Sequence, residues 1–169
     1  DADLPARSGL GSSSAFTVGL LNALFALRGK IITKRQLALD AIHLEQEKIK
    51  ENVGSQAQTA AAFGGLNRIE FGGPQKISVK PITLNYGRWD DFQKNFMLFF
   101  TGLSRNSSEI AAEQIKNASK NKHELRVMKG MVEEAIEILN SRKSLDAFGR
   151  LLHEGWKLKK SLARNISNS

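Results

Sequence analysis

Cysteine is absent from the sequence of 169 residues, which excludes disulfide bonds and thiolate metal sites from this chain. Long apolar runs are absent too. Thr17, Gly19 and Asn22 interrupt the longest apolar stretch, residues 15–27, whereas a membrane span needs about 18 such residues in succession. The three histidines show no metal-ligand spacing. A chain without cysteine fits the reducing cytoplasm, and we expect a cytoplasmic protein with no membrane partner.

Acidic residues are the minority among the charged residues, 17 against 25 lysines and arginines, so the net charge is +8. This balance favours anionic partners, from nucleic acid and membrane surfaces to nucleotides and sugar phosphates. The basic residues are spread along the chain, and their densest group is short: Lys157, Lys159 and Lys160. They lack interleaved aromatic residues, so we expect no nucleic-acid partner. A nucleic-acid binder, an alternative that rests on charge alone, would show a steep salt dependence of binding.

Apolar spacing and turn residues predict an α+β chain that begins with helices. A first helix follows the serines at 12–14 and ends near Gly29, and Thr33 caps a second helix. The second helix carries its apolar stripe at five positions: Leu37, Ala38, Ala41, Ile42 and Ile49. A short alanine-rich helix within residues 54–63 ends at two glycines. Two strands, 67–71 and 76–82, follow, with Gly72–Pro74 as their connection.

The second half of the chain is expected to be mainly helical. Phe96–Thr101 is predicted to be a compact buried strand. Three helices with i, i+3, i+4 apolar spacing then follow, and Ser144 caps the last: 107–118, 124–139 and 145–163. This order predicts two parts of different domains, residues 1–88 and 89–169, with a boundary near Tyr86–Asp91.

The segment Pro5–Ala15 reads Pro-Ala-Arg-Ser-Gly-Leu-Gly-Ser-Ser-Ser-Ala. Its two glycines let the N–H groups around Leu10 turn toward one point, and the helix that follows adds unpaired N–H groups and its positive dipole end. Together they form an anion cradle suited to a triphosphate, with the hydroxyls of Ser12 and Ser13 available to phosphate oxygens or Mg²⁺. The segment is neither a Walker A loop nor a dinucleotide fingerprint. A glycine–serine turn that only caps a helix is the alternative.

The same segment resembles the central glycine motif of the GHMP kinases, Pro-x-x-x-Gly-Leu-Gly-Ser-Ser-x-Ala. Five further stretches resemble the branch with heptose 7-phosphate kinases and fucokinase-like enzymes: residues 16–24, 51–58, 60–67, 100–105 and 156–160. The resemblance implies a partial GHMP kinase fold. This would comprise an N-terminal βα domain with the phosphate loop and the helical part of a ferredoxin-like C-terminal domain. It also implies ATP as the phosphoryl donor and Mg²⁺ as the metal.

The resemblance assigns roles to individual residues. Those implied to bind the ATP phosphates are Ser8, Gly9, Leu10, Gly11, Ser12, Ser13 and Ser14. Ser13 and Glu45 would hold Mg²⁺, because a hard cation prefers oxygen ligands. For the sugar phosphate we favour Arg105 on chemical grounds, because a guanidinium forms two parallel hydrogen bonds with phosphate and this residue follows the end of the expected strand. Arg7, Lys157 and Lys160 are weaker candidates. The alternatives are a solvated helix carboxylate for Glu45 and an ordinary helix-start arginine for Arg105.

One position departs from the family pattern. In this branch, a catalytic aspartate would fall within Gly-x-Gln-Asp-Gln, but the chain reads Gly54-Ser55-Gln56-Ala57-Gln58. Alanine can neither accept a proton nor orient a hydroxyl, and the loss of a general base typically lowers a rate by about 10²- to 10⁴-fold. We therefore expect a chain that binds ligands but turns over poorly. A deliberate aspartate-to-alanine substitution and a naturally weakened homologue both explain Ala57.

The implied activity is the ATP- and Mg²⁺-dependent phosphorylation of a sugar phosphate, D-glycero-D-manno-heptose 7-phosphate, at its anomeric hydroxyl. A fucose or other hexose 1-kinase is the alternative within this class, and a non-catalytic nucleotide-binding module is the alternative outside it. Two family motifs, the N-terminal sugar-binding motif and a C-terminal glycine-rich motif, do not occur in the sequence. We therefore expect a piece of a longer protein, with exposed apolar faces on residues 16–27 and 96–100 if the chain stands alone.

Overall fold

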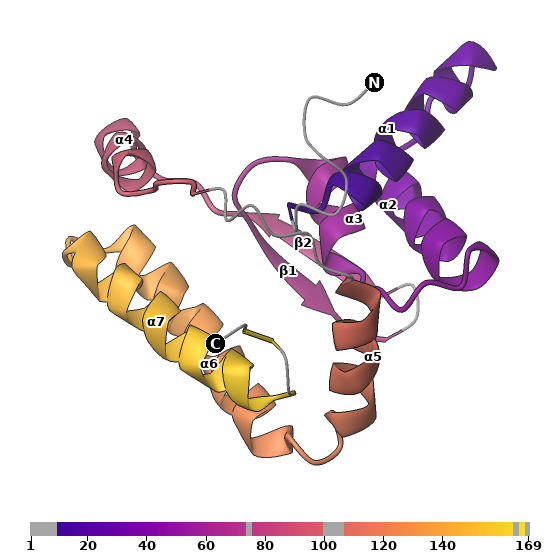
Figure 1. Ribbon diagram of the computed structural model, residues 1–169. Helices are drawn as coiled ribbons and strands as arrows, with labels where there is room; N and C mark the ends of the chain where they lie inside the picture. Colours follow the sequence, from indigo (N-terminus) through magenta and orange to yellow (C-terminus); the bar gives the residue numbers. More distant parts are fainter. Residues whose placement is uncertain (1–9, 74–75, 100–106, 164–165, 168–169) are drawn as a thin grey trace. The chain divides into compact units, whose positions relative to one another are not determined.

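The computed structural model describes residues 10–73, 76–99, 107–163 and 166–167 (Figure 1). The chain forms two compact units, one of residues 1–81 with 102–111 and the other of residues 82–101 with 112–169. Helices and one two-stranded sheet make up the described part, which confirms the predicted α+β class. The predicted domains, 1–88 and 89–169, stay a prediction, because compactness alone does not define a domain of a family.

Three helices and a hairpin build the first unit: α1 (Ser12–Leu27), α2 (Lys34–His43), α3 (Gln56–Phe63), β1 (Asn67–Phe71) and β2 (Ile77–Pro81). A π-helical turn, η1 (Leu44–Lys48), continues α2. The hydrophobic core lies where α1 meets α2, around the buried side chains of Val18, Leu37 and Ala41. The strands of the hairpin are antiparallel, with Asn67 opposite Pro81 and Phe71 opposite Ile77. Both predicted strands are confirmed.

The helix ends of this unit follow local backbone chemistry. Gly29, at φ 65°, ends α1, and the N–H groups of Gly29 and Lys30 donate to the carbonyls of Ala26 and Phe25 at 2.9 Å each. The Thr33 hydroxyl accepts a hydrogen bond from the Gln36 N–H at 3.1 Å and so caps α2. Both ends were predicted, because each depends on a residue type at one position.

The side of α1 away from this core carries exposed apolar side chains. Phe16, Leu20 and Leu24, four residues apart, are about half exposed or more, and Leu27 is 83% exposed. The exposed apolar face predicted for residues 16–27 is therefore present. Within the described residues, no helix is both long and apolar enough to cross a membrane.

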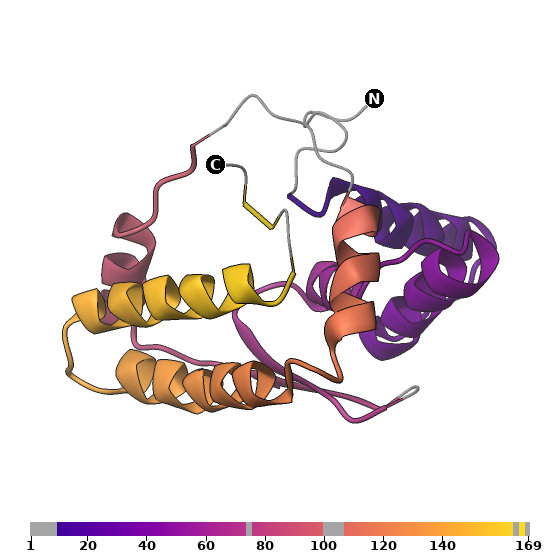
Figure 2. The same cartoon turned by 60° about the horizontal axis from the view of Figure 1, so that its bottom comes forward.

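The second unit consists mainly of a helical hairpin formed by α6 (Lys122–Asn140) and α7 (Leu145–Ser161), which lie side by side in Figure 2. The Ser144 hydroxyl accepts from the Asp146 N–H at 3.2 Å, which confirms the predicted cap of α7. Ile138 and Leu139 near the end of α6 are buried. Helix α5 (Ser107–Asn117) begins in the first unit and ends in the second. The three predicted helices of this half are confirmed.

Helix α4 (Tyr86–Lys94) occupies the segment where the sequence predicted a domain boundary, so the prediction missed this helix. The Asn85 side chain caps it by accepting from the Arg88 N–H at 2.8 Å. Trp89 and Phe92 follow at helical spacing, and the ring of buried Phe92 meets that of Phe148 edge-on, with centroids 5.3 Å apart. These aromatic contacts anchor α4 within the second unit.

The predicted buried strand at Phe96–Thr101 is wrong for residues 96–99, which form no strand and are exposed; Met97 and Leu98 are each 80% exposed. Residues 100 and 101 lie outside the described part. A strand needs a pairing partner, and among the described residues only β1 and β2 pair. The exposed apolar side chains expected for residues 96–100 are present at 96–99.

Arg88 ties the end of α6 to α4, and its removal provides a stability test. The guanidinium donates to the carbonyl oxygens of Ile138 at 2.7 Å, Lys143 at 2.8 Å and Leu139 at 3.3 Å. Because a charged donor would be lost from three carbonyls at and just beyond the end of α6, Arg88→Ala is expected to lower the free energy of unfolding by about 1.5–3 kcal/mol. Urea denaturation checks this, with exposed Arg142→Ala as the matched control. Equal effects of the two substitutions would contradict the anchoring role.

Candidate functional site

The candidate site begins at the N-terminus of α1. Gly11 is the N-cap residue and has a left-handed backbone, φ 73° and ψ 20°, which favours glycine. Among the described residues no side chain caps this end, and its first turn holds no acidic residue. The first N–H groups of a helix lack intrahelical partners and carry its positive dipole end, so this end is suited to an anion. Leu10 and Gly11 are exposed, which leaves room for one.

The three serines that follow face different surroundings. Ser13 is exposed and Ser12 is half-buried, whereas Ser14 is buried and its hydroxyl donates to Glu45 Oε2 at 3.0 Å. The sequence paired Ser13 with Glu45 as metal ligands, but the structure brings Ser14 to this carboxylate. Ser13 as a ligand stays a prediction. Ser8 and Gly9, predicted to bind phosphate, lie outside the described residues.

Glu45 lies on the π-helical turn and is only 1% exposed, so the alternative of a solvated carboxylate is wrong. Here the Ile49 N–H donates to the Leu44 carbonyl at 2.9 Å, five residues back. The wider turn changes the helical register, and Ile49, which the sequence placed on the apolar stripe, is exposed. The turn thus directs Glu45 inward and Ile49 outward.

Gln58 completes a buried polar cluster with Ser14 and Glu45. It is fully buried, and its Nε2 donates to the same Glu45 Oε2 that accepts from Ser14. Glu45 Oε1 and Gln58 Oε1 are buried and have no hydrogen-bond partner in the described part of the chain. A buried acceptor without a donor is unfavourable, and two of them in one cluster favour a cation.

The cluster fits Mg²⁺ by the chemistry of its oxygens. Mg²⁺ is typically held through one or two carboxylates together with water and substrate phosphates. Glu45 offers one such carboxylate oxygen, and the Ser14 hydroxyl of α1 lies 3.0 Å from its other oxygen. The described residues contain no group of three or more histidine, aspartate or glutamate side chains that could enclose a metal.

Position 57 lies beside the predicted phosphate loop. Ala57 is exposed in the first turn of α3, and a Cβ built on Gly11 would lie 3.7 Å from the Ala57 Cβ. A longer side chain at position 57 would therefore project next to the N-terminus of α1. The structure brings together Gly11, the serines of α1, Glu45 and the position of the expected aspartate.

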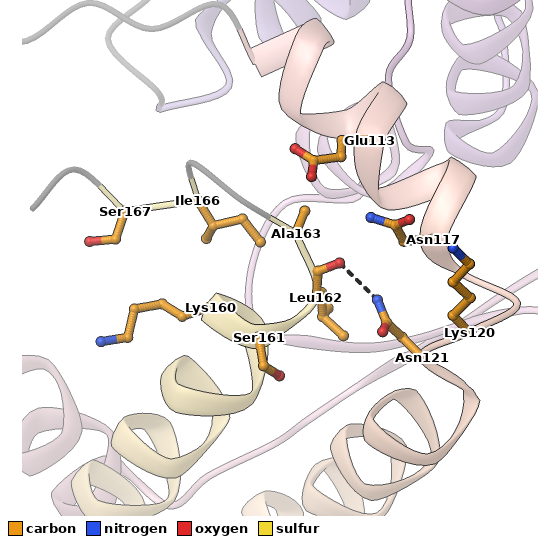
Figure 3. A pocket seen from close by; sticks show the side chains of 10 residues that line it. All are labelled: Glu113, Asn117, Lys120, Asn121, Lys160, Ser161, Leu162, Ala163, Ile166 and Ser167. Atoms are coloured by element: carbon orange, nitrogen blue, oxygen red, sulfur yellow. Dashed lines mark hydrogen bonds between the residues drawn. The ribbon is translucent and has the colours of Figure 1, made fainter.

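The predicted sugar-phosphate ligand Arg105 and the weaker candidate Arg7 lie outside the described residues. Lys157 donates to Glu154 at 2.7 Å, and this bond holds the pKa of the Glu154 carboxyl below its ordinary value. Lys160 lines a cavity of about 530 Å³ in the second unit, together with Lys120, Asn117 and Asn121 (Figure 3). The two ammonium groups lie on opposite sides of this cavity in Figure 3, so they do not converge on one anion.

Two functional contacts escaped the sequence analysis. Ser14 was assigned to phosphate, and Gln58 was part of the family-like string without a role of its own. The one available signal was that Gln58 directly follows position 57, which places both in the first turn of a helix. Nothing in the sequence indicates that either side chain reaches Glu45.

Residues 1–65 match the family described as "GHMP kinases N terminal domain". This match lies in the first part of the chain, and it confirms the predicted resemblance and the partial α+β GHMP fold.

The chain is 27% identical to the D-glycero-alpha-D-manno-heptose 7-phosphate kinase of Campylobacter jejuni over 169 residues, which cover 99% of the chain and 50% of that protein. It is 26% identical to the L-fucokinase/L-fucose-1-P guanylyltransferase of Bacteroides fragilis over 166 residues, 95% of the chain and 17% of that protein. Both relatives are sugar kinases by name. The chain spans about half the length of the first relative and less of the second.

Proposed function

We propose that this chain is part of a kinase that transfers the γ-phosphoryl group of ATP to the anomeric hydroxyl of D-glycero-D-manno-heptose 7-phosphate. One observation carries the proposal: Gly11 at the N-terminus of α1 lies beside position 57, and Ser14 of the same helix turn contacts the buried carboxylate of Glu45. An anion site, a carboxylate for a cation and the position of the expected aspartate therefore adjoin one another. The similarity to a heptose 7-phosphate kinase supports the sugar.

Each part of the site has a role in this proposal. The N–H groups of the loop and of the first turn of α1 bind and orient the ATP phosphates. Ser13 and Glu45 hold Mg²⁺, which when bound neutralises charge on the phosphates. Arg105 binds the 7-phosphate of the sugar through its guanidinium. Phosphoryl transfer depends mainly on such positioning and charge neutralisation, so these residues supply most of what the reaction needs from the protein. The proposed location is the cytoplasm.

Two other candidate functions rest on specific observations. A fucose or other hexose 1-kinase is supported by the similarity to an L-fucokinase domain. A non-catalytic nucleotide-binding module is supported by Ala57, which removes the expected proton acceptor.

Calorimetry on the intact protein tests the proposal. We expect binding of ATP in the presence of Mg²⁺, and binding of heptose 7-phosphate but not of fucose to the nucleotide-loaded protein. Binding of fucose alone would favour the hexose 1-kinase, whereas binding of ATP with neither sugar would favour the nucleotide-binding module. Absence of ATP binding would overturn the kinase proposal as a whole.

A further inference from the structure

Two hydrogen-bond donors from different helices meet at one oxygen of Glu45. The Ser14 hydroxyl on α1 and the Gln58 amide on α3 both donate to Oε2, and neither donates to Oε1. The residues are separated by 31 and 13 positions from Glu45, so this arrangement comes from the packing of three elements. Ser14, Glu45 and Gln58 are 6%, 1% and 0% exposed, which keeps water from competing for these bonds.

The two bonds fix which carboxylate oxygen is available to a ligand. Because two donors from different directions bind Oε2, the carboxylate cannot rotate about its Cγ–Cδ bond without breaking both hydrogen bonds. Oε1 is then the oxygen that stays unpaired and buried in the described part of the chain. A metal-binding side chain that is oriented by hydrogen bonds from neighbouring residues binds the metal more tightly. Loss of those hydrogen bonds typically weakens metal affinity by about 10- to 100-fold.

We propose that Ser14 and Gln58 are positioning residues that hold Glu45 so that its Oε1 is presented to the divalent cation accompanying ATP. This inference rests on the proposed function, because the cation is the one that the kinase reaction requires. It gives Ser14 a different task from phosphate binding, since its hydroxyl hydrogen is already donated to Glu45.

The test measures the affinity of the intact protein for Mn²⁺ by electron paramagnetic resonance, with Mn²⁺ as the probe and ATP present. Ser14→Ala and Gln58→Met each remove one donor while nearly keeping the side-chain volume. Each is expected to weaken Mn²⁺ binding by about 10- to 100-fold. Affinity for ATP in excess chelator is expected to stay at the wild-type value, because the variants leave the backbone N–H groups of the loop in place. Ser14→Thr, which keeps the hydroxyl, is expected to retain most of the Mn²⁺ affinity.

A matched control is offered by Gln36 on α2, whose amide donates to Asp40 Oδ1 at 2.8 Å on the surface of the same unit. Gln36→Met removes a bond of the same kind, glutamine to carboxylate, and is expected to leave Mn²⁺ affinity unchanged. Circular dichroism without metal establishes that each variant is folded. If Gln58→Met fails to fold, Ser14→Ala with its threonine rescue decides the question.

The outcomes separate this inference from the proposed function. Wild-type Mn²⁺ affinity in Ser14→Ala and Gln58→Met, with affinity lost in Glu45→Gln, would overturn the positioning roles and leave the kinase proposal standing. Wild-type Mn²⁺ affinity in Glu45→Gln as well would overturn both the positioning roles and the metal site of the proposed function. If a variant loses affinity for ATP in excess chelator to the same extent as it loses affinity for Mn²⁺, the defect is a general structural one. This result would also overturn the positioning roles.

Discussion

Replacing Ala57 by aspartate is expected to raise the rate of ATP-dependent phosphorylation by about 10²- to 10⁴-fold, the usual contribution of a general base. The new carboxylate would project beside the N-terminus of α1, because the Ala57 Cβ lies 3.7 Å from a Cβ built on Gly11. The fold tolerates the change: Ala57 is exposed, and the first turn of α3 holds no acidic residue and is a favourable place for one.

Release of ADP from ATP with heptose 7-phosphate as acceptor measures this effect on the intact protein. Ala57→Asn is the conservative control, since it has nearly the shape of aspartate but cannot accept the proton, and its rate is expected to stay near that of the alanine form. Ala60→Asp, at an exposed position of the same helix, controls for added negative charge. An unchanged rate in Ala57→Asp would remove position 57 from the proposed mechanism.

Features governed by single local residues were predictable from the sequence. Gly29 ends α1 because its φ of 65° is unfavourable for other residues, and Thr33 and Ser144 cap helices through hydroxyls one turn from their partners. Gly11 at the N-terminus of α1 belongs to the same group. Each of these helix ends depends only on one residue type and its immediate neighbours. The sequence therefore predicts them correctly.

Features that depend on distant partners were not predictable. The apolar run at residues 96–99 has the composition of a buried strand, but burial requires a surface to pack on, and the run itself does not supply one. Helix α4 was missed because its aromatic residues are separated by charged ones, so that its apolar spacing is weak until Phe148 is known to lie against Phe92. In both cases, the structure depends on whether another part of the chain packs against the segment, which the segment's own sequence does not reveal.

The candidate site divides in the same way. The glycines follow from the motif, and Glu45 and position 57 follow from the family resemblance, whereas neither identifies which of three consecutive serines contacts Glu45. Successive residues of a helix point about 100° apart, so only one of three neighbours can face a given carboxylate. The π-helical turn at 44–48 also changes the direction in which its side chains point, and the residue types do not reveal this turn. The packing of α1 and α3 around that turn selects Ser14 and Gln58.

Glu45→Gln is expected to have two opposite effects, one on stability and one on function. Without metal, the substitution replaces the carboxyl group, whose buried Oε1 has no partner in the described part of the chain, by a neutral amide, while the remaining oxygen can still accept from Ser14 and Gln58. The free energy of unfolding in chelator is therefore expected to rise by about 1–3 kcal/mol, because a buried carboxylate without a partner is more unfavourable than a buried neutral amide. The Mg²⁺-dependent part of ATP binding is expected to disappear, because a neutral amide is a much weaker ligand for a hard cation than a carboxylate.

Urea denaturation in chelator and ATP titrations across Mg²⁺ concentrations measure the two effects. Glu47→Gln, an exposed carboxylate on the same turn, serves as the control and is expected to change neither quantity appreciably. The two results are informative together, since a residue kept only for packing would be expected to gain stability without any loss of Mg²⁺ response. A less stable glutamine variant that still binds ATP in a Mg²⁺-dependent manner would mean that Glu45 is a structural residue. In that case the buried Oε1 would need a partner other than the cation.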